Sequence, residues 1–302
     1  MTTRFEGVFP ALITPFTADG SAVDEMALKA VVERAIDAGV GGLVSTGSTG
    51  EVTTLSGDER RQVLETVIEA ASGRVPTVAG TSALTTAETI ALSVYAERSG
   101  AAAVMIIPPF YGAPLWRETR AHYEAVADRV SIPIMYYNMP SASGTTLSLE
   151  QFEQLRRAGV TSMKDSSGDG VTATALIQKG EAVPTYLNGA DTLTFAALAA
   201  GVKGIVWGAA SFMPAEAVRL HRLLIEDVDL AAARDLWSKL WPICQFLEGT
   251  SYAAAVKAAC RVVGLTTGPV RRPSLEITRD EQMELARLLA AAGIGAPVAV
   301  PA

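Results

Sequence analysis

The chain has 302 residues, of which 49% are hydrophobic and 19% charged, and its formal net charge is −7. It can bury a sizeable core, and its acidic balance argues against a nucleic-acid groove or an anionic membrane surface as a partner. Two cysteines and two histidines are too few for a disulfide framework or a His-rich metal cage. The sequence starts without a secretory signal and holds no run that could span a bilayer, so we expect a cytoplasmic protein.

Short apolar runs alternate with longer amphipathic patterns along the first three quarters of the chain. Strands are expected at residues 8–14, 42–46, 76–80, 102–107, 132–137, 160–164, 185–188 and 204–207. Helices are expected after the first five, at residues 26–38, 58–72, 86–99, 115–128 and 148–157. Most runs are unbroken hydrophobics, which is typical of parallel strands covered on both faces. Ser56 with Glu59, and Ser148 with Gln151, have the spacing of a capping box.

This alternation predicts an α/β fold, a (β/α)8 TIM barrel over residues 1–225. An open doubly wound sheet is the alternative, because counting strands does not prove closure. Three more amphipathic patterns follow, at residues 230–247, 251–263 and 279–291. No Pro/Gly-rich linker precedes them, so residues 226–302 are expected to form a C-terminal helical appendage on the same structural unit. The tail from residue 293 onward is expected to be loose.

Chemistry in such a barrel lies at the carboxyl ends of the strands. Of six lysines, only Lys164 ends a strand-like run; the others fall in helical patterns or, for Lys203, before the eighth strand. A lysine there must be desolvated or paired, and desolvation favours the nucleophilic, uncharged amine. Such an amine forms a Schiff base with a carbonyl, an electron sink for carbon–carbon bond chemistry. The alternative is a structural ion pair with Asp165.

Two further segments follow predicted strands. Tyr137 ends the fifth strand, where a buried phenol either donates to a backbone carbonyl or relays protons to the reacting oxygen. Residues 47–50 form a glycine-rich turn whose N–H groups and hydroxyls suit a carboxylate or phosphate, although a plain turn would also explain it. The turn lacks the lysine of a P-loop and the spacing of a dinucleotide site. Glu51 either pairs with a backbone group or braces this loop.

Asp191 follows the seventh strand, and we favour slightly an N-cap of the next helix over a contact with ligand. Asp165 and Asp169 flank the lysine loop, but two carboxylates do not make a metal site. We therefore expect no metal centre.

Together these residues resemble the dihydrodipicolinate synthase/N-acetylneuraminate lyase family of Schiff-base, pyruvate-dependent aldolases. The motifs are Gly-Ser-Thr-Gly-Glu at 47–51, Tyr-Asn-Met-Pro at 137–140 and Lys-Asp-Ser-Ser-Gly-Asp at 164–169, in that order. The resemblance runs from about residue 7 to residue 275.

The resemblance implies that Lys164 forms the Schiff base with pyruvate or another 2-oxo acid, and that Tyr137 relays protons. Ser48 and Thr49 would hold the substrate carboxylate, with Thr49 also in the relay. Tyr111 would reach into the site of a neighbouring subunit, which implies a homotetramer built as a dimer of dimers. No metal or organic cofactor is implied, since the lysine itself supplies the electron sink.

The resemblance also implies substrate contacts at Val206, Gly189, Asp191 and Ala142. Synthases of the family typically carry an arginine where this chain has Ala142, and that arginine binds the carboxylate of aspartate semialdehyde. Losing such a partner costs roughly 1.5–3 kcal/mol unless another group replaces it.

Arg117 and Arg120 are the candidates to replace that arginine. Sialic acid lyases typically have Asp-Glu after the seventh strand, whereas this chain has Asp191 followed by Thr192. Trp207 either adds bulk at the acceptor end of the site or points into the helix layer.

Three functions remain open from the sequence. The first is a Schiff-base lyase that cleaves, condenses or dehydrates a sugar-derived 2-oxo acid. The alternative is 4-hydroxy-tetrahydrodipicolinate (dihydrodipicolinate) synthase, which condenses pyruvate with aspartate semialdehyde, and Ala142 is the feature against it. A non-catalytic barrel that binds a 2-oxo acid is the hypothesis of another class.

Overall fold

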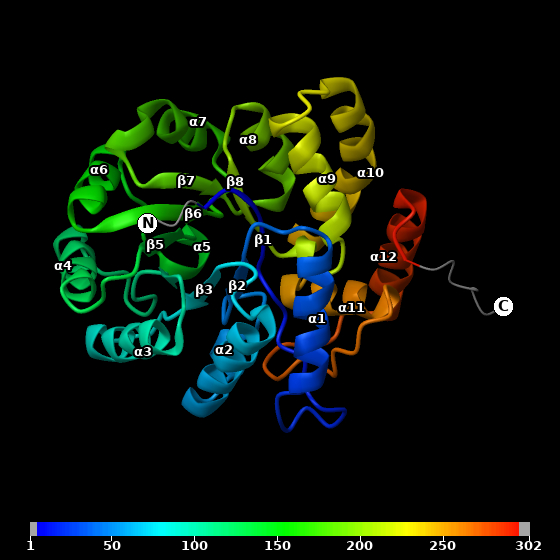
Figure 1. Ribbon diagram of the computed structural model, residues 1–302, viewed down its shortest axis with the longest axis horizontal. Helices are drawn as coiled ribbons and strands as arrows, with labels where there is room; N and C mark the ends of the chain where they lie inside the picture. Colours follow the sequence, from blue (N-terminus) through cyan, green and yellow to red (C-terminus); the bar gives the residue numbers. More distant parts are fainter. Residues whose placement is uncertain (1–4, 296–302) are drawn as a thin grey trace.

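Eight parallel strands form a barrel (Figure 1). The computed structural model describes residues 5–295. The strands are β1 (Gly7–Pro10), β2 (Leu43–Ser45), β3 (Thr77–Gly80), β4 (Ala103–Ile106), β5 (Ile134–Asn138), β6 (Val160–Asp165), β7 (Thr185–Asn188) and β8 (Gly204–Trp207). Their order is β1-β8-β7-β6-β5-β4-β3-β2, and the two ends meet at a parallel bridge between Ala11 and Val44. Because the ends meet, the open doubly wound alternative is wrong.

Helices follow each of the strands on the outside of the barrel (Figure 1). They are α1 (Glu25–Asp37), α2 (Gly57–Ala71), α3 (Thr86–Ser99), α4 (Trp116–Ala127), α5 (Pro140–Ser143), α6 (Leu149–Arg157), α7 (Gly170–Lys179), α8 (Thr194–Ala199) and α9 (Pro214–Ile225). The capping boxes predicted at Ser56 and Ser148 are present, at the starts of α2 and α6. The sequence analysis did not predict α5, a single turn that begins at a proline just after β5.

Three helices follow the barrel, as expected: α10 (Leu230–Glu248), α11 (Tyr252–Val262) and α12 (Arg279–Ala292). They pack against one another, and α10 also packs against α9 (Figure 1). Their buried side chains join one apolar cluster with side chains of α1, β1 and β8. In the expected loose tail, Ile294 is buried at 4% exposure, and residues 296–302 lie outside the described residues.

Two strand boundaries differ from the prediction by more than one residue. The first strand was expected to run to residue 14, but β1 ends at Pro10. Ala11 and Leu12 still contact the sheet, since the Leu12 N–H donates to the Val44 carbonyl at 2.9 Å, but the Phe16 N–H donates to the Thr267 carbonyl, at 2.9 Å. The fifth strand was expected from residue 132, but β5 begins at Ile134, directly after Pro133, which has no N–H for the ladder.

Side chains alternate between two apolar regions along each strand. Phe9, Val44, Met135, Leu187 and Val206 belong to a cluster inside the barrel. Neighbouring residues in the strands pack against the helices in the two larger clusters. No helix within residues 5–295 combines the length and apolar character needed to cross a membrane.

Candidate active site

Tyr137 and Lys164 end neighbouring strands and face the inside of the barrel. They are paired directly in the ladder between β5 and β6, and each is only 5% exposed. The Lys164 Nζ atom lies 4.2 Å from the centre of the Tyr137 ring. The two residues predicted to carry Schiff-base chemistry are therefore neighbours.

A bulge in β6 decides which way Lys164 points. Ile134 of β5 pairs with Val160, but the next residue of β5 pairs with Ser162, so β6 carries one extra residue between these partners. Val160 belongs to the apolar layer under the helices. The extra residue changes the alternation, and Lys164 comes to lie on the inner face.

Asp165 does not pair with Lys164. It is the next residue in the strand and faces the helix layer, where its carboxylate accepts hydrogen bonds from Asn138 Nδ2 at 2.8 Å and from the Tyr186 hydroxyl at 3.1 Å. Lys164 forms no salt bridge with any residue that the structure describes. The alternative of a structural ion pair with Asp165 is therefore wrong.

Gly189, directly after β7, leaves room for the lysine side chain. A Cβ atom at Gly189 would lie 2.7 Å from both Cγ and Cε of Lys164 and 2.6 Å from Ser166 Oγ. Carbon atoms in contact are about 3.5–4.0 Å apart, so a larger residue would displace the lysine. Gly189 lines the cavity as predicted, and it acts by having no side chain.

The turn after β2 presents Ser48 and Thr49. Thr46 and Glu51 bracket it with left-handed φ values of 51° and 54°. The backbone N–H groups of Ser48 and Thr49 donate to no other described residue, and both residues line the same cavity as Lys164. Two such N–H groups with adjacent hydroxyls suit a carboxylate.

The cavity that contains Lys164 and Tyr137 has a volume of about 340 Å³. It lies where the barrel rule places chemistry, among the segments that follow the strands. Its remaining polar lining is rich in hydroxyl and carboxylate groups, from Ser141, Ser166, Ser167, Asp191, Glu248 and Tyr252. The cavity can therefore hold a 2-oxo acid and a second polar molecule.

Asp191 lies in this cavity and is not a helix cap. It begins a short 3-10 helix without capping it or α8, so the N-cap interpretation is wrong. Its carboxylate accepts a hydrogen bond from the Tyr252 hydroxyl at 2.7 Å. Burial raises the pKa of Asp191 to about 7, and the Tyr252 hydrogen bond only partly offsets this effect.

Two of the polar lining residues come from the C-terminal helices, and neither was predicted from the sequence. Glu248 ends α10, and its carboxylate accepts hydrogen bonds from the Thr192 backbone N–H at 3.3 Å and hydroxyl at 2.7 Å. Tyr252 begins α11, and Gly208 leaves space for its ring. Neither residue belongs to a sequence motif, and the only signal in the sequence was that each lies at the end of a helix.

Lys257 of α11 was also missed, since it was expected only as a helical residue. Its side chain is 0% exposed, and Nζ lies 2.5 Å from Glu51 Oε1. Burial lowers the pKa of Lys257, and the Glu51 charge opposes that shift. Glu51 therefore braces the turn, which was one of its two predicted roles.

Strand alternation separates Val206 from Trp207. Val206 packs inside the barrel in the same cluster as Tyr137 but does not line the cavity, so the expected substrate contact at Val206 is not present. Trp207 is 1% exposed and packs in the helix layer, with its ring 6.4 Å from that of Trp237. It therefore adds no bulk to the cavity, although its indole is among the groups that lower the pKa of Asp191.

Ala142 was expected at the substrate but lines a neighbouring cavity of about 300 Å³, because it lies in the unpredicted helix α5. Tyr137 and Ser48 line both cavities. Neither Arg117 nor Arg120 lines either of them, so neither replaces the missing arginine in this chain's own site.

Tyr111 is 89% exposed and lies outside both cavities of its own chain. Its insertion into a neighbouring subunit stays a prediction. Asp169 caps α7 through the backbone N–H groups of Val171 and Thr172. Within residues 5–295, no three His, Cys, Asp or Glu side chains gather as metal ligands would.

Comparisons with known proteins agree with this geometry. The model of the dihydrodipicolinate synthetase family matches residues 4–292. The 4-hydroxy-tetrahydrodipicolinate synthase of Sorangium cellulosum is 40% identical over 94% of this chain and 96% of its own, and that of Methanopyrus kandleri is 36% identical over 95% and 96%.

A solved structure shares the fold as well. The chloride-inhibited dihydrodipicolinate synthase of Acinetobacter baumannii, complexed with pyruvate, superposes with a TM-score of 0.91 at 30% identity, over 96% of this chain and 100% of its own. The family match covers nearly the whole chain, including the C-terminal helices. The protein is therefore a lyase that belongs to the dihydrodipicolinate synthetase family.

Proposed function

We propose that this lyase acts on pyruvate through a Schiff base with Lys164. The observation that carries the proposal is the pairing of Tyr137 with Lys164, in one cavity with Ser48 and Thr49, whose N–H groups donate to no other described residue. A buried amine beside a phenol and a carboxylate-binding turn suits a 2-oxo acid better than any other common metabolite class.

In the proposed reaction the Lys164 amine attacks C2 of pyruvate, and loss of water leaves a protonated Schiff base. Loss of a proton from C3 gives an enamine, whose C3 attacks the carbonyl carbon of an aldehyde while the aldehyde oxygen gains a proton. Water then releases the product from the lysine. The Tyr137 hydroxyl carries protons in these steps, with Thr49 and a neighbouring subunit's Tyr111 extending the relay.

Aspartate semialdehyde is our leading candidate for the aldehyde. Relatives that are 32–40% identical over nearly the whole chain carry the name 4-hydroxy-tetrahydrodipicolinate synthase. This supports the alternative raised in the sequence analysis better than the sugar-derived 2-oxo acid that was placed first.

A neutral, hydroxylated aldehyde remains the second candidate, because one observation favours it. Lys164 is the only basic residue among the described residues that line the cavity, while Asp191 and Glu248 add carboxylates. A second carboxylate on the acceptor would meet like charge, whereas sugar hydroxyls would find acceptors.

The experiment has two stages. Intact-mass analysis after incubation with pyruvate and borohydride should find one reduced pyruvate, which peptide mapping places on Lys164; Lys164→Ala should show none. Turnover with pyruvate is then compared between aspartate semialdehyde and glyceraldehyde. If pyruvate gives no adduct under conditions that label a known family member, the Schiff-base proposal is overturned. A higher kcat/KM with glyceraldehyde than with aspartate semialdehyde would make the hydroxylated aldehyde the leading candidate for the acceptor.

Three further properties belong to the same proposal. The reaction needs no metal or organic cofactor, so activity should survive dialysis against EDTA. The exposed Tyr111 supports a homotetramer, which sedimentation can measure. The acidic composition and the substrate class support a location in the cytoplasm.

A further inference from the structure

Glu51 and Lys257 form an ion pair directly behind the carboxylate-binding turn. Their side chains are 2% and 0% exposed, and the charged atoms lie 2.5 Å apart. Lys257 also donates to the Pro269 carbonyl at 3.1 Å and lies 4.0 Å from the centre of the Phe16 ring. Glu51 is the last residue of the turn, whereas Lys257 comes from α11, so the pair joins the C-terminal helices to the site.

The turn is held at both of its final residues. The Thr14 hydroxyl donates to the Gly50 carbonyl at 2.8 Å. The other carboxylate oxygen of Glu51 accepts the Arg271 backbone N–H at 2.9 Å, and the Glu51 N–H donates to the Ser48 carbonyl at 3.0 Å. The position of Ser48 therefore depends on where the Glu51 side chain is anchored.

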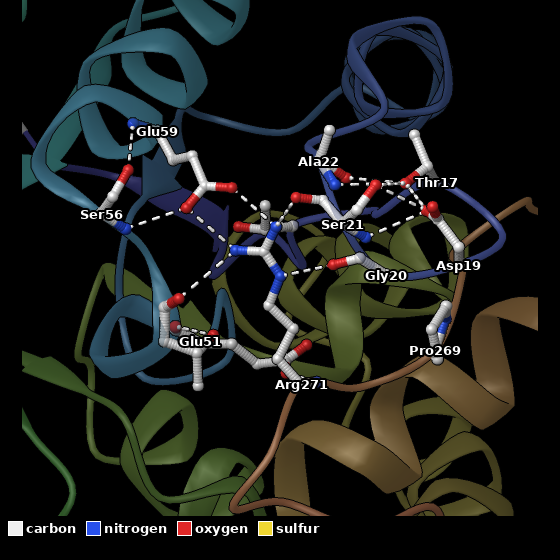
Figure 2. A network of polar contacts seen from close by, with 12 residues as sticks. Thr17, Asp19, Gly20, Ser21, Ala22, Glu51, Ser56, Glu59, Pro269 and Arg271 are labelled. Atoms are coloured by element: carbon white, nitrogen blue, oxygen red, sulfur yellow. Dashed lines mark hydrogen bonds and ion pairs between the residues drawn. The ribbon is translucent and has the colours of Figure 1, made fainter.

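The same C-terminal segment also holds the far end of the loop between β2 and α2. Figure 2 shows the Arg271 guanidinium between the Glu59 carboxylate and the Gly20 carbonyl, with contacts of 2.6 Å and 2.8 Å. Glu59 in turn accepts the Ser56 N–H in the capping box of α2. Residues 257–271 thus hold the segment that follows Ser48 and Thr49 at two places, Glu51 and Glu59.

Stability alone does not account for this arrangement. A buried ion pair is often replaced by apolar residues without loss of stability, because desolvation offsets the attraction. Glu51 has a left-handed φ of 54°, uncommon for a residue with a Cβ atom. Such a conformation persists where the surroundings hold it, and it is found preferentially at functional sites.

We infer that Glu51 and Lys257 are positioning residues, which hold the turn so that the N–H groups of Ser48 and Thr49 face the substrate carboxylate. The inference rests on the proposed function, because it needs a 2-oxo acid at Lys164. In this inference, α11 and the segment after it position the groups that bind the substrate carboxylate, while the reacting residues lie in the barrel strands.

The test compares two carbonyl probes, pyruvate and acetone, which differ in the carboxylate. Borohydride trapping on Lys164 is measured for each in the wild type and in the double variant Glu51→Gln/Lys257→Met, which removes both charges together. Trapping of pyruvate should fall by about ten- to a hundredfold, the loss expected for a misplaced binding group, and trapping of acetone should stay unchanged. The KM for pyruvate should rise by a similar factor while the KM for the aldehyde does not.

Two controls separate positioning from general damage. Val256→Ala shortens a buried side chain next to Lys257 in the sequence, and Lys179→Met breaks a peripheral salt bridge to Glu153. Both should keep the wild-type ratio of pyruvate to acetone trapping. An equal fall in Val256→Ala would show that loosening α11 suffices, and would overturn the inference.

The inference and the proposed function can fail separately. No pyruvate adduct on the wild type refutes the proposed function and, with it, the inference. A wild-type adduct with an unchanged trapping ratio in the double variant refutes the inference alone. If the double variant does not fold, Glu51→Gln gives the same comparison, because the amide keeps the side-chain shape but removes the charge that anchors Lys257.

Discussion

The Tyr137 ring and the Lys164 amine are held together by register: the two residues are cross-strand partners between β5 and β6. Because β6 contains the extra residue Thr161, the Lys164 side chain faces the inside of the barrel, as the Tyr137 side chain does. One backbone irregularity therefore places the proposed nucleophile beside the proposed proton carrier.

Tyr137→Phe should separate nucleophilic from acid–base chemistry. The variant keeps the ring beside the amine, so borohydride should still trap pyruvate on Lys164. Because the phenol carries protons in the proposed reaction, kcat should fall by about 10²–10⁴-fold. Steady-state kinetics at saturating pyruvate checks this, and a kcat within twofold of the wild type would exclude Tyr137 from the relay.

Gly189→Ala should disable the lysine without unfolding the protein. The new methyl group would occupy the space of Lys164 Cγ and Cε, so the rate of borohydride trapping should fall at least tenfold. Gly170→Ala is the matched control, since nothing lies within 4 Å of its Cβ position. The control should trap at the wild-type rate, and equal trapping by both variants would contradict the steric argument.

Asp191→Asn should change how stability depends on pH. The pKa of Asp191 is raised from 3.8 to about 7, so its contribution is fully present below about pH 4 and is lost as pH rises through 7. The asparagine variant does not titrate, so between pH 4 and pH 7 its free energy of unfolding should rise relative to that of the wild type, by an amount on the order of 4 kcal/mol at most. Urea unfolding at pH 4, 5.5 and 7.5 measures the difference, and parallel curves would contradict it.

Glu248→Gln should distinguish the two acceptor candidates. Removing this charge from the cavity should lower the KM for aspartate semialdehyde several-fold, since like charges repel. For a hydroxylated aldehyde the same change weakens a hydrogen-bond acceptor and should raise KM. Glu150→Gln, on the exposed side of α6, serves as the control.

Arg271→Ala should destabilise the protein more than an ordinary surface arginine. Arg271 binds Glu59 and lies 4.0 Å from the centre of the Phe16 ring, and its side chain is only 16% exposed. We expect a loss of about 2 kcal/mol, less than for a fully buried pair. Arg287→Ala, whose partner Glu284 is 44% exposed, should cost below about 1 kcal/mol in the same denaturant titration.

Most of the fold, and the part of the site around Lys164, could be predicted from the sequence. Apolar runs of strand length predicted all eight strands, and the rule that chemistry follows the strands led to Lys164, Tyr137 and the turn at Ser48. These residues are local: each lies at the carboxyl end of its strand or within a few positions after it, so spacing and the family motifs reveal it.

The acceptor end could not be predicted in the same way. Glu248 and Tyr252 reach the cavity only because α10 and α11 fold back on the barrel, a long-range contact that helical periodicity does not encode. Ala142 was misplaced because the single turn α5 turns it toward the neighbouring cavity, and so short a helix leaves no periodic pattern. Lys257 looked like any other lysine in a helix, since its burial depends on a carboxylate 206 residues earlier in the chain.

The position of these groups along the chain has a consequence for biosynthesis. All eight strands leave the ribosome before Glu248, Tyr252, Lys257 and Arg271 have been added. A nascent barrel thus contains Lys164 and Ser48 before it has the side chains that anchor Glu51 and that form part of its pocket wall. We therefore expect a truncated chain that ends before residue 248 to keep Lys164 but to lose part of the pocket wall and the partner of Glu51, and with them the selective binding of a substrate carboxylate.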